Sequence, residues 1–185
     1  MNKQVFILNG SGGVGKDTFV DLVSQYIPTI HFSSVAKVKE IAKAIGWNGE
    51  KTEKDRKFLS DLKLLCTKYN NMPFNSIKEK VSEFLNGDAV ALFIDIREPN
   101  EIEIAKQAFN AKTVLIKRNS VKHITSNMAD EHVFDYNYDF IINNDGTFDE
   151  LEDKALEFIR VVYGKNKKWF NWRHLFDEYN IAKEW

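Results

Sequence analysis

The stretch Gln4-Val-Phe-Ile-Leu-Asn-Gly-Ser-Gly-Gly-Val-Gly-Lys-Asp-Thr18 decides the fold of this chain. Its first six residues form an almost continuous apolar run, which is typical of a strand buried on both faces of a parallel sheet. Glycines follow at once, and a helical pattern then runs from Lys16 to about Tyr26. The stretch therefore predicts a strand, a glycine-rich loop and a helix in direct succession.

Residues 10–18 fit the phosphate-binding pattern G-x-x-x-x-G-K. Glycines let successive backbone N–H groups point inward at a polyphosphate, and the start of the helix adds partial positive charge. Lys16 would reach the β- and γ-phosphates of ATP as a catalytic point charge. We therefore expect an ATP-binding loop composed of Gly10, Gly12, Gly13, Val14, Gly15, Lys16, Asp17 and Thr18.

Candidate Mg²⁺ ligands come from the loop and from a second apolar strand. A hydroxyl at position 17 would normally ligate the ion, so either Asp17 contacts it or Thr18 takes over. Leu92-Phe-Ile-Asp95 has the form of a Walker B strand, which would place Asp95 at the carboxyl edge of the sheet, where open α/β sheets bind ligands. Arg97 follows two residues later and is expected to bind an acceptor phosphate through two parallel hydrogen bonds. A surface ion pair between Asp95 and Arg97 is the alternative.

Apolar strand patterns alternate with helical patterns as far as residue 162. Such alternation implies right-handed crossovers and an α/β fold, in which helices cover both faces of a parallel sheet. Ser33 and Ser34 are candidate caps for one helix. A capping box at Thr52 begins another, in which Phe58, Leu62 and Leu65 recur at helical spacing as an apolar stripe. Further strands are predicted at 29–32, 89–94, 113–116 and 140–142, and helices at about 35–45, from 52, 76–86, from 99 and 147–162.

Composition excludes several classes of protein. A length of 185 residues suits one domain, and 43% hydrophobic with 29% charged residues is typical of a soluble globular protein. Lys and Arg total 26 against 27 Asp and Glu, which argues against bulk electrostatic binding to nucleic acid. The only cysteine, Cys66, favours a reducing compartment, and no signal or membrane-spanning segment is recognisable. We expect a cytoplasmic protein without a membrane or nucleic-acid partner.

The last 21 residues, 165–185, differ from the rest of the chain. Trp169, Trp172, Phe176 and Tyr179 recur there at helical spacing after a basic run. The pattern predicts an aromatic C-terminal helix packed on the domain. A homodimer contact through the same helix is the alternative.

Four segments, in this order and spacing, resemble the phage-type deoxynucleoside monophosphate kinases, a family of P-loop nucleoside and deoxynucleoside monophosphate kinases. They are residues 10–18, Ser34-Val-Ala-Lys-Val-Lys-Glu-Ile41, Ile94-Asp-Ile-Arg97 and Ile142-Asn-Asn-Asp-Gly-Thr147. The resemblance covers roughly residues 4–160. The wider group includes animal-type phosphomevalonate kinase and dephospho-CoA kinase.

The resemblance implies a three-layer P-loop NTPase fold with a five-stranded parallel sheet in the order 2-3-1-4-5. It implies a kinase domain over 1–164, with an acceptor-binding helical region at about 35–86 and a lid at about 118–138. Carried over by position, Lys39 and Arg56 face the acceptor. Arg118 is the first residue of the lid and is a catalytic and ATP-binding residue. Asn144 and Asp145 resemble the loop on the adenine side of ATP.

The expected function is Mg²⁺- and ATP-dependent phosphoryl transfer to a nucleoside or deoxynucleoside monophosphate, which gives the diphosphate and ADP. One alternative keeps the reaction but takes phosphomevalonate or dephospho-CoA as the acceptor. The other is a nucleotide-binding module that no longer transfers phosphate, since the predicted lid contains only one arginine, Arg118.

Overall fold

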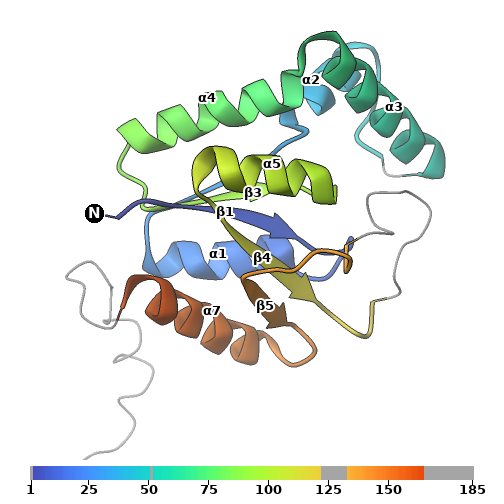
Figure 1. Cartoon of the computed structure of the whole chain (residues 1–185). Helices are drawn as coiled ribbons and strands as arrows, with labels where there is room; N and C mark the ends of the chain where they lie inside the picture. The colour runs from blue at the N-terminus through green and yellow to red at the C-terminus, as the bar shows by residue number, and fades with distance from the viewer. Residues whose placement is uncertain (1, 51, 122–132, 165–185) are drawn as a thin grey trace, which may run out of the picture.

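A computed structural model describes residues 2–50, 52–121 and 133–164 (Figure 1). Residues 122–132 of the predicted lid and the predicted C-terminal helix lie outside these ranges. In chain order the elements are β1 (Gln4–Asn9), α1 (Lys16–Tyr26), β2 (Thr29–Ser33), α2 (Ala36–Ala44), α3 (Glu53–Asn70), α4 (Met72–Asn86), β3 (Ala91–Asp95), α5 (Pro99–Phe109), β4 (Lys112–Lys117), β5 (Phe140–Asn143) and α7 (Phe148–Tyr163).

All five strands are parallel and lie in the order β2-β3-β1-β4-β5, which confirms the predicted topology. Parallel pairing brings every carboxyl end to one edge of the sheet. The register places Leu8 of β1 and Ser33 of β2 on either side of Asp95 of β3. The loop that leaves β1 therefore begins beside the end of β3.

Helices cover both faces of the sheet and form three layers (Figure 1). Helices α1 and α7 pack on one face, where the rings of Phe6, Phe19, Phe93 and Phe158 meet. Helices α4 and α5 cover the other face through Ile77, Phe84, Ile102 and their neighbours. Burial of both faces explains why β1 and β3 are apolar at every inner position rather than at alternate ones.

Helices α2 and α3 form an arm beyond the carboxyl edge of the sheet, where they pack against each other and against α4 (Figure 1). The predicted apolar stripe on α3, at Phe58, Leu62 and Leu65, does not enter the core, since α3 has no buried residue and Leu65 is 64% exposed. The reason is that α3 packs mainly on the helices α2 and α4. We call this part the α2–α3 arm.

Two predicted helix starts need correction, and one is confirmed. Neither Ser33 nor Ser34 caps α2, because the cap position is Val35 and no side chain caps it. Ser33 instead ends β2, and the Ser34 backbone N–H donates to the Asp95 carbonyl at 3.3 Å. Helix α4 begins at Met72 rather than Ser76, because a proline in the first turn needs no N–H partner. The capping box at Thr52 is present.

Among the described residues, no helix is both long enough and apolar enough to cross a membrane.

Candidate active site

The loop between β1 and α1 needs glycine at particular positions. Gly13 and Gly15 have φ angles of +82° and +94°, in the left-handed region that favours glycine. A Cβ atom at Gly10 would lie 2.5 Å from the backbone oxygen of Ile116 in β4. The loop therefore turns tightly and passes directly over the end of the neighbouring strand.

Lys16 folds back along this loop. Its Nζ donates to the carbonyl oxygens of Gly10 and Ser11, at 2.6 and 3.0 Å. These bonds hold the ammonium group against the loop that is predicted to surround a polyphosphate. Asp17 and Thr18 follow in the first turn of α1, and the Asp17 side chain is 86% exposed.

Asn9 links the loop to Arg97. The Gly10 backbone N–H donates to Asn9 Oδ1 at 2.8 Å, and Asn9 Nδ2 donates to the Arg97 carbonyl at 3.1 Å and to the Tyr138 hydroxyl at 2.7 Å. Tyr138 in turn donates to the Val133 carbonyl at 2.8 Å. Burial raises the pKa of Tyr138 to about 12, so its hydroxyl keeps its proton as a donor at neutral pH. This network fixes where Arg97 leaves the sheet relative to the glycine-rich loop between β1 and α1.

Asn144 and Asp145, the residues assigned to the adenine side, have structural roles at the same edge. Asn144 is buried, and its Nδ2 donates to the Val14 carbonyl at 2.9 Å, which supports the loop from below. Asp145 accepts from the backbone N–H and the side-chain amide of Asn119, at 2.6 and 2.8 Å. Asp145 therefore holds the turn after β4 that carries Arg118, whose side chain is exposed.

Lys39 and Arg56 lie on the α2–α3 arm rather than on the sheet edge. Lys39 is in α2, Arg56 is in the first turn of α3, and each is half-buried and has interaction partners of its own. Their proposed contact with an acceptor stays a prediction.

A three-member ion cluster connects α3 of the arm to the segment just after Arg97. Lys63 of α3 lies 2.7 Å from Glu98 and 2.8 Å from Glu101, and its side chain is only 13% exposed. Burial alone would raise the pKa of both carboxyl groups, but Lys63 lowers that of Glu98, whereas the neighbouring Glu98 charge helps to raise that of Glu101. The cluster gives the arm a fixed attachment next to the candidate site.

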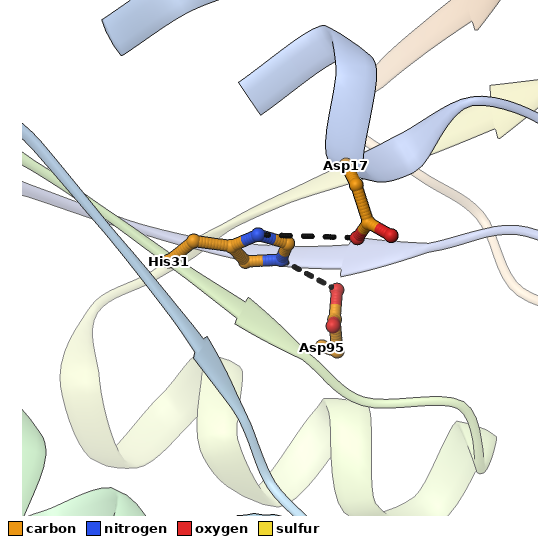
Figure 2. A group of neighbouring side chains, drawn as sticks. All are labelled: Asp17, His31 and Asp95. Carbon is orange, nitrogen blue, oxygen red and sulfur yellow. Dashed lines mark hydrogen bonds and ion pairs between the residues drawn. The ribbon is translucent and has the colours of Figure 1, made fainter. Parts of the chain in front are cut away.

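Sequence analysis missed His31. This residue of β2 lies between the two acidic residues proposed as metal ligands, with Nε2 3.1 Å from Asp95 Oδ1 and Nδ1 4.0 Å from Asp17 Oδ1 (Figure 2). The hydrogen bond to Asp95 raises the pKa of His31, burial opposes it, and the charges of Asp95, Asp17 and Asp21 add to the rise. The only sequence signal is a histidine in the middle of a short predicted strand.

The structure thus brings Asp17 and Asp95 together, as a shared metal site requires. One ligand atom from each of Asp17, His31 and Asp95 lies within 4.8 Å of the others. Carboxylate oxygens suit Mg²⁺, and an imidazole nitrogen suits transition ions. The donor set therefore fits a divalent cation beside the glycine-rich loop.

No protein-family model and no curated protein matches this sequence. Solved structures do match its fold. A shikimate kinase from Aquifex aeolicus superposes with a TM-score of 0.50 over 88% of this chain and 100% of its own, at 14% identity. A tunicamycin resistance protein from Deinococcus radiodurans gives 0.52 over 88% and 97%, at 10% identity. Together with the strand order 2-3-1-4-5 and the helices on both faces, these likenesses show that the chain has the fold of the P-loop kinases.

Proposed function

We propose that this protein transfers the γ-phosphate of ATP to a nucleoside or deoxynucleoside monophosphate and so produces the diphosphate and ADP. The observation that carries the proposal is the junction at the carboxyl ends of β1 and β3. There the loop of residues 10–18 holds Lys16, and the Asn9 side chain links the loop to Arg97. Donor phosphates and an acceptor phosphate would meet at such a junction.

The proposed roles follow from charge and position. The loop binds the phosphates of ATP, and Lys16 offsets the charge that develops on the transferring group. Asp95, with Asp17 or Thr18, would hold Mg²⁺, which neutralises phosphate charge when bound. No covalent intermediate with the protein is required, since positioning and charge neutralisation account for phosphoryl transfer.

The acceptor side is assigned to Arg97, Lys39 and Arg56, and the donor side to Arg118, Asn144 and Asp145. Arg97 is the strongest assignment, because the Asn9 and Tyr138 network fixes its backbone beside the loop. The α2–α3 arm stands at the same edge and carries Lys39 and Arg56. The kinase domain of 1–164, the acceptor region of 35–86 and the lid of 118–138 belong to this proposal, as does a cytoplasmic location.

The test is ADP formation from ATP with a panel of acceptors and purified protein. The panel contains the nucleoside and deoxynucleoside monophosphates, phosphomevalonate, dephospho-CoA and shikimate. We expect turnover with at least one monophosphate. Turnover with only one of the other acceptors would refute the proposal that the acceptor is a nucleoside monophosphate, but it would support the kinase reaction. ATP binding without turnover on any acceptor would favour a non-catalytic nucleotide-binding module.

Arg97→Lys separates acceptor binding from ATP binding. Lysine offers a point charge where arginine offers two parallel bonds, so KM for the acceptor should rise while ATP affinity stays the same. A fall in kcat as well would mean that Arg97 aligns the reacting oxygen. Arg160→Lys in α7 is the matched control, because Arg160 lies near Glu157 on the surface, at 3.7 Å. Loss of ATP affinity alone in Arg97→Lys would contradict the assigned role.

A further inference from the structure

Three elements bring His31 to the candidate metal ligands. Asp17 is in the first turn of α1, His31 is in the middle of β2, and Asp95 ends β3. His31 pairs with Phe93, and Phe93 packs on the α1 face of the sheet. Side chains of a strand alternate between faces, so His31 and Asp95, two residues beyond Phe93, point to that same face. Figure 2 shows the imidazole ring between the two carboxylates, below the start of α1.

One pair of donor atoms has the spacing of adjacent ligands in a coordination shell. Metal–nitrogen and metal–oxygen bonds of transition ions are about 2.0–2.2 Å, so two adjacent ligand atoms around one ion lie about 3 Å apart. His31 Nε2 and Asp95 Oδ1 are 3.1 Å apart and share a hydrogen bond, so a bound ion would take the place of the proton between them. The Asp17 carboxylate is within reach and is 86% exposed, so its side chain can turn without disturbing the core.

We propose that Asp17, His31 and Asp95 form a divalent-cation site in which His31 is a nitrogen ligand, so that the site binds a transition ion such as Co²⁺ more tightly than Mg²⁺. Imidazole is a better ligand for transition ions, whereas Mg²⁺ takes oxygen ligands almost alone. This proposal deepens the metal role that the proposed function gives to Asp17 and Asp95, and it rests on that role. It adds that the ion is selected by this chain and not only by the phosphates of ATP.

The opposite interpretation is that the His31 ring takes the place of a cation. A positively charged imidazole would offset the repulsion between the two carboxylates and would compete with any metal ion. The two interpretations predict opposite effects of removing the ring. If the ring is a nitrogen ligand, its removal weakens transition-metal binding. If the ring competes with the metal ion, its removal strengthens that binding.

The experiment titrates the protein with Co²⁺ in the absence of nucleotide and follows both calorimetric heat and the visible absorption of the bound ion. We expect Co²⁺ to bind more tightly than Mg²⁺, and His31→Asn to weaken Co²⁺ binding at least about tenfold with little change for Mg²⁺. The remaining histidines, His123, His132 and His174, lie outside the described residues. A variant with all three replaced by asparagine is the matched control and should keep the Co²⁺ site.

Unchanged or tighter Co²⁺ binding by His31→Asn would overturn the proposal, as would loss of the site in the control variant. Circular dichroism checks the fold of each protein. Asp17→Asn is a second variant. The Asp17 side chain is exposed, so this substitution should leave the fold intact, and it should also weaken Co²⁺ binding. ATP turnover is measured separately, with Mg²⁺. Intact Co²⁺ binding without turnover refutes the proposed function, whereas turnover with no effect of His31→Asn on Co²⁺ refutes this inference.

Discussion

At the scale of single residues, the candidate site depends on side chains that carboxylates or backbone carbonyls hold in place. Lys16 is held by two loop carbonyl oxygens, and His31 lies between Asp17 and Asp95. Each side chain is therefore in place without large rearrangement. Preorganised charge of this kind contributes more to a transition state than charge that must first be ordered.

Lys16→Ala should lower the rate of phosphoryl transfer on the order of 10²–10³, since loss of one preorganised charge costs about 3–4 kcal/mol in the transition state. Steady-state kinetics measures the loss, and circular dichroism verifies the fold. Lys112→Ala is the control, because Lys112 begins β4 at the opposite edge of the sheet. Wild-type turnover by a folded Lys16→Ala protein would refute the phosphate-loop assignment.

His31 should make stability depend on pH in a defined direction. Its folded pKa is raised above the ordinary value of 6.5, so its contribution is fully present below pH 6.5 and is lost as pH rises through the folded pKa. The difference in free energy of unfolding between wild type and His31→Asn should therefore be largest below pH 6.5 and shrink at higher pH. Urea denaturation in the presence of EDTA measures it. A difference that grows with pH would contradict the ion pairs to Asp17 and Asp95.

At the scale of elements, the phosphate loop shows why two glycines in the same motif are not equivalent. Both Gly10 and Gly13 have positive φ angles, but only Gly10 lies against another strand. Gly13 has no atom within 4 Å of the position that a Cβ would take. One glycine is needed for both conformation and space, and the other for conformation alone.

Gly13→Ala should cost about 1–2 kcal/mol of stability, which is the strain of a left-handed alanine. Gly10→Ala adds a steric conflict with the Ile116 carbonyl and should cost about 2–5 kcal/mol. Urea-induced unfolding of the two variants side by side gives both values. Equal losses would mean that the loop does not pass over β4 as closely as described.

At the scale of the whole molecule, one aromatic cluster joins the sheet to the layer that α1 and α7 form on one of its faces. The ring of Phe158 in α7 lies 5.0 Å from that of Phe6, 5.5 Å from that of Phe19 and 5.1 Å from that of Phe140. These rings belong to β1, α1 and β5. Helix α7 therefore covers the sheet beneath the phosphate loop and supports it from the face opposite α4 and α5.

Phe158→Ala should destabilise the protein by about 3–5 kcal/mol, because it removes a large buried ring and leaves a cavity among the others. Phe148→Ala, in the same helix, should change stability by less than about 0.5 kcal/mol, since Phe148 is 58% exposed. Thermal and urea unfolding measure both variants. A similar small effect of the two substitutions would contradict the central position of Phe158.

The amino-acid sequence was enough to predict the strand, loop and helix over residues 4–26, the alternation of strands and helices, and the parallel α/β class. These features are local, because glycine requirements, apolar runs and helical periodicity act over a few neighbouring residues. The resemblance added the strand order, which the structure confirmed. Local patterns misjudged α3, whose apolar residues looked like core, because periodicity does not reveal whether a helix meets a sheet or stands in an arm.

Only the tertiary structure decided which side chains meet at the site. His31 and Asp95 are 64 residues apart, and Asn144 supports a loop residue 130 positions away. The register of the parallel strands brings these residues together, since it aligns the carboxyl ends of all five strands at one edge. The number of residues between two strands does not reveal how the strands are aligned in the sheet. A histidine in the middle of β2 therefore looked ordinary in the sequence, and the folded sheet placed it between two carboxylates.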